Sequence, residues 1–126
     1  MSLHSQAVHF PIALLLVSSI LTLWNERRPH HELAITARWC LNIGWWSSLL
    51  AVMTGILAVA LAFDQIRQQL TWINSHAVVS LSLVAVYWRL VLGKPLPAAA
   101  QKRRHIVGIG LIVLAGWLGG QLSERI

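Results

Sequence analysis

Histidine is the residue type in this sequence best suited to carry chemistry. The chain has six histidines, one cysteine and four acidic residues, and a neutral imidazole is the commonest metal ligand in proteins. Two of the histidines, His9 and His76, adjoin long apolar stretches. The other four lie in the segments that flank those stretches: His4, His30, His31 and His105.

His76 lies on a polar stripe of a predicted helix. Ser80, Leu83 and Tyr87 follow it at steps of four, three and four residues, which places all four on one helical face. Ionisable residues within apolar helices usually face the interior of a bundle and not lipid. We therefore expect His76 to point inward, with Ser80 as a candidate partner for the second imidazole nitrogen.

Small residues recur at helical spacing in two other apolar stretches. One stripe runs through Gly44, Ser48, Ala51 and Gly55, and the last stretch carries a second set: Gly108, Ala115, Gly116, Gly119 and Gly120. Such stripes let a neighbouring helix, or a flat cofactor, approach the backbone closely. In helices of alternating direction, Gly55 and the last three glycines share a level with His9 and His76.

Two imidazoles facing a glycine-lined space is the arrangement that a bis-histidine b-type haem needs. The sequence therefore suggests haem b, with His9 and His76 as axial ligands and with Gly55, Gly116, Gly119, Gly120 and Ser80 around it. A simpler interpretation stays open. The glycines also fit plain helix packing, and His9 also fits an interfacial residue.

Other chemistry has less support in the sequence. A zinc site lacks a cluster of cysteines or carboxylates, and Asp64 would add at most one ligand. A second haem on the opposite side would need His105 together with His30 or His31. Neither a nucleophile with its base nor a phosphate-binding loop is present, so we do not expect an enzyme.

The composition places these residues in a membrane protein. Of the 126 residues, 56% are hydrophobic and 11% are charged, whereas soluble domains carry about 25% charged residues. The net charge of +6 comes from basic residues in short segments between apolar stretches, not from one amphipathic face. That distribution argues against nucleic-acid binding.

Four stretches are long enough to cross a bilayer as helices. They cover residues 6–24, 39–63, 70–90 and 106–123, and a span needs about 20 residues. The connections between them are short, which favours antiparallel neighbours. We predict an all-α fold: one transmembrane domain, residues 1–126, built as an up-down-up-down bundle of four helices.

The basic residues predict the orientation in a bacterial inner membrane. Arg67 and Arg125 are the only ones expected on one side. The other side holds Arg27, Arg28, Arg38, Arg89, Lys94, Lys102, Arg103 and Arg104. Positively charged segments stay in the cytoplasm, so both termini, His9 and His76 are expected outside.

The segment Ala7-Val8-His9-Phe10-Pro11-Ile12-Ala13-Leu14-Leu15 resembles the opening signature of an uncharacterised bacterial membrane family, the domain of unknown function 2231. Thr54-Gly55, His76 and the segment Gly116-Trp117-Leu118-Gly119-Gly120 resemble its later motifs. The family is similar in layout to small b-type cytochrome bundles, and some members are joined to Rieske-type iron–sulfur domains. The resemblance implies a redox setting.

Two functions follow as expectations. The first is a membrane haem protein that transfers electrons, with lipid around it and a separate redox partner or a larger redox complex beside it. The second is a structural accessory subunit of a respiratory or photosynthetic membrane complex, in which the small-residue stripes pack against other helices.

Overall fold

The computed structural model describes residues 3–126, and within them it is helical without a strand. The helices are α1 (Leu3–Ala7), α2 (His9–Arg27), α3 (His31–Ile66), α4 (Leu70–Val91) and α5 (Ala98–Arg125). A short 3-10 helix, η1 (Arg67–Gln69), separates α3 from α4. The prediction of an all-α protein is confirmed.

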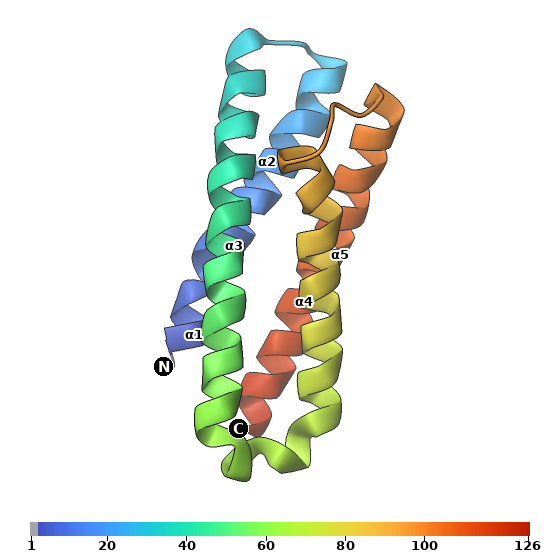
Figure 1. Ribbon diagram of the computed structural model, residues 1–126. Helices are drawn as coiled ribbons and strands as arrows, with labels where there is room; N and C mark the ends of the chain where they lie inside the picture. Colours follow the sequence, from blue (N-terminus) through green and yellow to red (C-terminus); the bar gives the residue numbers. More distant parts are fainter. Residues whose placement is uncertain (1–2) are drawn as a thin grey trace.

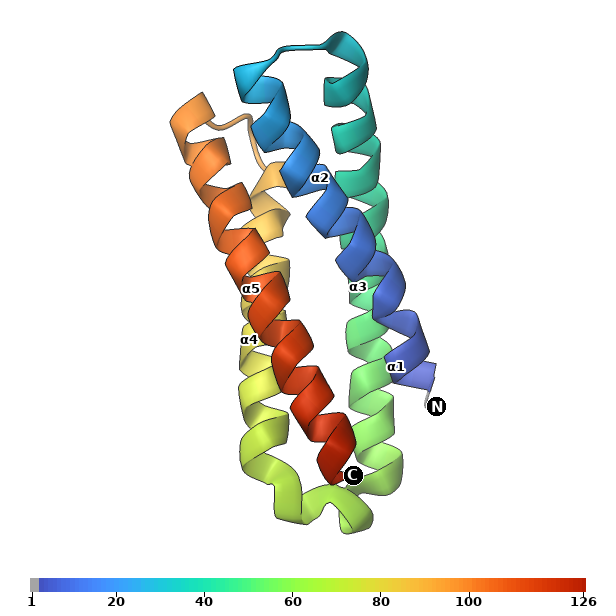
Figure 2. The ribbon, with the colours of Figure 1, turned by 180° about the vertical axis from the view of Figure 1, so that it is seen from behind.

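The long helices lie side by side and form an elongated molecule (Figure 1). One end carries both longer connections, residues 28–30 and 92–97, and we call it the loop end. The opposite end carries η1 and the C-terminus, and we call it the η1 end (Figure 2). α2 packs most closely on α3, and α4 packs most closely on α5. α1 continues α2 along the side of α3.

Proline and backbone geometry explain where the helices end. Arg28 precedes Pro29 and has φ −133° and ψ 81°, because a residue before proline is pushed out of the helical region. Pro97, with ψ 150°, precedes the first residue of α5. Near the η1 end, Ala62 leaves helical geometry with φ −119° and ψ 19°, just before the chain turns into α4.

The prediction of four separate spans is confirmed only in part. Three helical segments are long and apolar enough to cross a membrane: Leu3–Arg27, His31–Val91 and Ala98–Arg125. The middle segment has 61 residues, because η1 joins α3 to α4 without a non-helical break. The helices also extend beyond the apolar stretches on which the sequence boundaries rested. α3 already begins at His31, and α5 at Ala98.

The apolar core lies toward the loop end. Its buried members are Leu15, Leu41, Trp45, Leu83, Tyr87, Leu90, Val91 and Ile112. Toward the η1 end the helices bury much less, and Ile66 is the one buried residue between positions 52 and 82. One half of the bundle is therefore densely packed by its own side chains, and the other half is not.

Close approaches and side-chain hydrogen bonds hold the packed half together. A Cβ at Gly44 would lie 3.1 Å from the backbone nitrogen of Leu15, so α2 and α3 approach at this glycine. Trp45 Nε1 donates to the carbonyl of Val84 at 3.0 Å, and Arg38 donates to the carbonyl of Leu90 at 2.8 Å. A positive charge near the last carbonyls of α4 also interacts favourably with the negative end of the helix dipole.

Candidate functional site

Two histidines face each other in the loosely packed half of the bundle. The ring centroids of His4, from α1, and His76, from α4, are 6.2 Å apart, with an angle of 79° between the ring planes. Both side chains are partly buried. Helices far apart in the sequence thus bring two imidazoles together.

His9 does not take part in this pair. Its side chain is exposed, and its Nδ1 lies 2.5 Å from the carbonyl oxygen of Ser5. Five residues separate it from His4, which amounts to about 140° around a helix of 3.6 residues per turn. Because His4 faces α3, His9 must face away from it. The structure brings His4, and not His9, next to His76.

Hydrogen bonds on α3 orient the imidazole of His4. Its Nδ1 lies 3.0 Å from the carbonyl oxygen of Ala51 and 3.1 Å from Oγ1 of Thr54. Thr54 itself donates to the same carbonyl at 2.7 Å. A carbonyl only accepts, so Nδ1 of His4 carries the proton and Nε2 keeps a free lone pair. Metal-binding histidines are commonly held in this way.

His76 has a nitrogen without a partner. Its Nδ1 is buried and makes no hydrogen bond within the described residues, although the backbone of Ala115 lies near the ring. Ser80, one turn further along α4 and partly buried, does not supply the bond. An unsatisfied buried polar group costs about 1–3 kcal/mol. This one nitrogen of the ring is therefore open to a partner from outside the described residues.

A glycine lies against each imidazole. A Cβ at Gly55 would come within 2.8 Å of Cε1 of His4, and a Cβ at Gly119 within 3.2 Å of Cε1 of His76. These two of the four predicted glycines are thus at the site. A Cβ at Gly116 or at Gly120 would meet open space, so these two glycines lie away from the imidazoles.

The whole chain matches one protein family. The family model described as "Predicted membrane protein (DUF2231)" covers residues 1–126. The chain belongs to this family. Neither the search of curated proteins nor the search of solved structures gives a match.

The remaining histidines of this DUF2231 protein lie near the loop end. His30 and His31 are exposed beside the connection between α2 and α3, whereas His105 on α5 is buried. Within the described residues no group of three or more His, Cys, Asp or Glu side chains could hold a metal ion. Asp64, which the sequence suggested as at most one ligand of a zinc site, is exposed at the η1 end.

His105 belongs to a buried polar network that the sequence did not predict. Ser19 Oγ lies 2.5 Å from the hydroxyl of Tyr87 and 2.9 Å from Nδ1 of His105. Ser19 and Tyr87 are 0% exposed. The only sequence signal was the pair Ser18-Ser19 inside an apolar helix, which does not identify its partners.

Proposed function

We propose that this DUF2231 protein is a membrane haem protein that transfers electrons, with His4 and His76 as the axial ligands. The observation that carries the proposal is the pair of neighbouring imidazoles with 6.2 Å between ring centroids. Two imidazoles on opposite sides of one metal ion have centroids about 6 Å apart, since each metal–nitrogen bond is about 2 Å and each ring centre lies about 1 Å beyond its nitrogen. The pair replaces the sequence-based choice of His9 with His76.

The surroundings of the pair fit the group. His4 offers Nε2 because Nδ1 is bonded to Ala51, and His76 has a buried nitrogen without a partner. Gly55 and Gly119 provide the space in which the two rings sit.

A bound haem would accept and release single electrons at this place. The chain contributes the ligands, fixes the proton of His4 on Nδ1 through the Ala51 carbonyl, and limits water through the surrounding helices. Imidazole ligation and burial are also the means by which a protein sets the reduction potential. A separate protein or a larger membrane redox complex would exchange the electrons.

The same proposal includes a topology. α2, α3, α4 and α5 would cross a bacterial inner membrane in alternating directions, with the loop end in the cytoplasm. Eight lysines and arginines support this, from Arg27 to Arg104, because all belong to the loop-end segments, whereas Arg67 and Arg125 belong to the η1 end. His4, His76 and both termini would then lie toward the outer side.

An accessory subunit is the second candidate. Gly116 and Gly120 are exposed and one turn apart on α5, and nothing occupies the space beside them. Small residues at this spacing let a helix of another protein approach closely. In that case the protein would stabilise a larger complex without redox chemistry of its own.

The test is the absorption spectrum of detergent-purified protein from a haem-replete host, reduced minus oxidised. We expect b-type bands that His4→Ala and His76→Ala abolish or convert, because each variant loses one axial ligand. His9→Ala and His31→Ala are matched controls and should keep the spectrum at equal expression.

Two results would count against the proposal. Wild-type protein without haem would leave the accessory-subunit function as the better account. Loss of the spectrum in His9→Ala, with His4→Ala unaffected, would restore the sequence-based pair of His9 and His76.

A further inference from the structure

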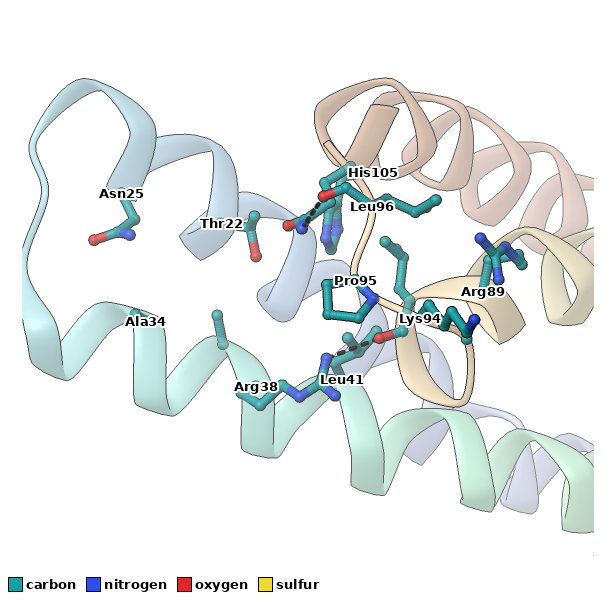
Figure 3. A pocket seen from close by; sticks show the side chains of 14 residues that line it. Thr22, Asn25, Ala34, Arg38, Leu41, Arg89, Lys94, Pro95, Leu96 and His105 are labelled. Atoms are coloured by element: carbon teal, nitrogen blue, oxygen red, sulfur yellow. Dashed lines mark hydrogen bonds between the residues drawn. The ribbon is translucent and has the colours of Figure 1, made fainter. Parts of the chain in front are cut away.

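A cavity of about 360 Å³ opens at the loop end of the bundle, away from the paired histidines. All four long helices and the connection before α5 contribute to it (Figure 3). Its polar and charged lining consists of Thr22, Asn25, Arg38, Arg89, Lys94, Gln101 and His105.

The charge of this cavity is not compensated from within. Arg38, Arg89 and Lys94 line it, whereas no Asp or Glu does so in the described part of the chain. The one ion pair among the described residues, Lys102 with Glu26 at 3.8 Å, uses none of the lining cations. Three positive charges around a concave surface create a potential that attracts anions.

Arg38 is held in place by one hydrogen bond, and its guanidinium has further donors that this bond does not use. Its Nη1 donates to the carbonyl of Leu90 at 2.8 Å, which ties α3 to the end of α4 (Figure 3). A guanidinium has five N–H donors and no acceptor. The remaining donors are available to a ligand, and arginine is well suited to phosphate because its donors form a planar fork.

The buried network adds a donor from the opposite wall. Tyr87 is 0% exposed, and Ser19 is its only hydrogen-bond partner among the described residues. Tyr87 must therefore donate to Ser19 Oγ, since its proton has no other acceptor. Ser19 then donates to Nδ1 of His105. His105 consequently carries its proton on Nε2, and the residue itself lines the cavity.

We propose that this cavity binds a phosphate group, held by Arg38 and His105, with Lys94 and Arg89 adding positive charge. The ligand must offer acceptors and negative charge, because the lining offers donors and cations. In the topology proposed above, the loop end faces the cytoplasm, so the cavity would lie at the level of the phosphate headgroups of the cytoplasmic leaflet. An anionic phospholipid and a free phosphate share this chemistry. Haem binding is not required.

The experiment measures binding of phosphatidylglycerol to the full chain in detergent by native mass spectrometry. Phosphatidylcholine, which has no net charge, and inorganic phosphate are run in parallel. We expect the anionic lipid to bind about tenfold more tightly than the zwitterionic one. Displacement of the lipid by millimolar inorganic phosphate would identify a free phosphate compound as the ligand. Its persistence would identify the lipid.

Two variants locate the site. Arg38→Gln keeps a donor for the Leu90 carbonyl and removes the charge, so its affinity should fall about tenfold. Lys94→Gln alters an exposed residue that makes no described hydrogen bond, and severalfold weakening is expected even if Arg38→Gln fails to fold. Arg103→Gln is the control, because Arg103 is exposed at the same end but does not line the cavity.

The outcome separates a defined site from general attraction to a basic surface. Equal binding of both lipids would overturn the proposal. It would also fail if Arg103→Gln weakened binding as much as Lys94→Gln. Unchanged affinity in both lining variants would have the same consequence.

Discussion

Gly108 is the position at which the smallest change should have the largest effect on the packed core. It is buried on α5 against the ring of Tyr87, and a Cβ added there would overlap the phenol and lie 2.6 Å from Cε2. Tyr87 cannot move aside easily, because it is 0% exposed and bonded to Ser19. Gly108→Ala must therefore shift the tyrosine or the two helices.

The magnitude follows from two destabilising terms and one stabilising term. Overpacking a filled site costs about 1–3 kcal/mol, and a weakened bond to Ser19 adds about 1 kcal/mol. Alanine contributes up to about 1 kcal/mol through its higher helix propensity. The net expectation is a loss of about 1–3 kcal/mol in the free energy of unfolding.

Gly110→Ala is the matched control, two residues further along the same helix. A Cβ there meets no atom within 4 Å, so the change should be neutral or slightly stabilising. Both variants are unfolded in detergent by increasing SDS and followed by circular dichroism. Stabilities of the two variants that agree within about 0.5 kcal/mol would refute the close approach of α4 and α5 at Gly108.

Three further predictions follow. Tyr87→Phe should lower the free energy of unfolding by about 1–2 kcal/mol in the same SDS titration, because Ser19 loses its buried partner on α4; an unchanged midpoint would contradict the network. Gly55→Ala should lower haem content per chain by displacing His4, whereas Gly116→Ala should not; equal content in both would exclude His4 from the site. A reporter fused after Ile126 should read as external, and a cytoplasmic signal would reverse the proposed orientation.

The candidate site was partly predictable from the sequence. His76, Gly55 and Gly119 were predicted to share a level of the bundle, and the structure places these two glycines against His4 and His76. The prediction of His9 rested on its position beside an apolar stretch. His4 lies five residues earlier, on the same helical stripe as Pro11 and Leu15, both buried. That helical spacing was the signal in the sequence that could have pointed to His4 as an inward-facing residue.

The remaining features have no local signature. Ser19 is separated by 68 residues from Tyr87 and by 86 from His105, and a hydroxyl in an apolar helix can also bond to its own backbone. The loop-end cavity likewise draws residues from four helices. In the sequence, the positions of its basic residues indicate only the orientation in the membrane.

Four properties can be derived from the amino-acid sequence: the all-helical class, membership of the DUF2231 membrane family, the apolar stretches and the unequal distribution of basic residues. These are sums over neighbouring residues, so they do not depend on how the helices pack. The packing of the helices, by contrast, brings His4 next to His76 and joins Ser19, Tyr87 and His105 in one network. Each residue turns a helix by about 100°, so the rotation and crossing of the helices select which side chains meet.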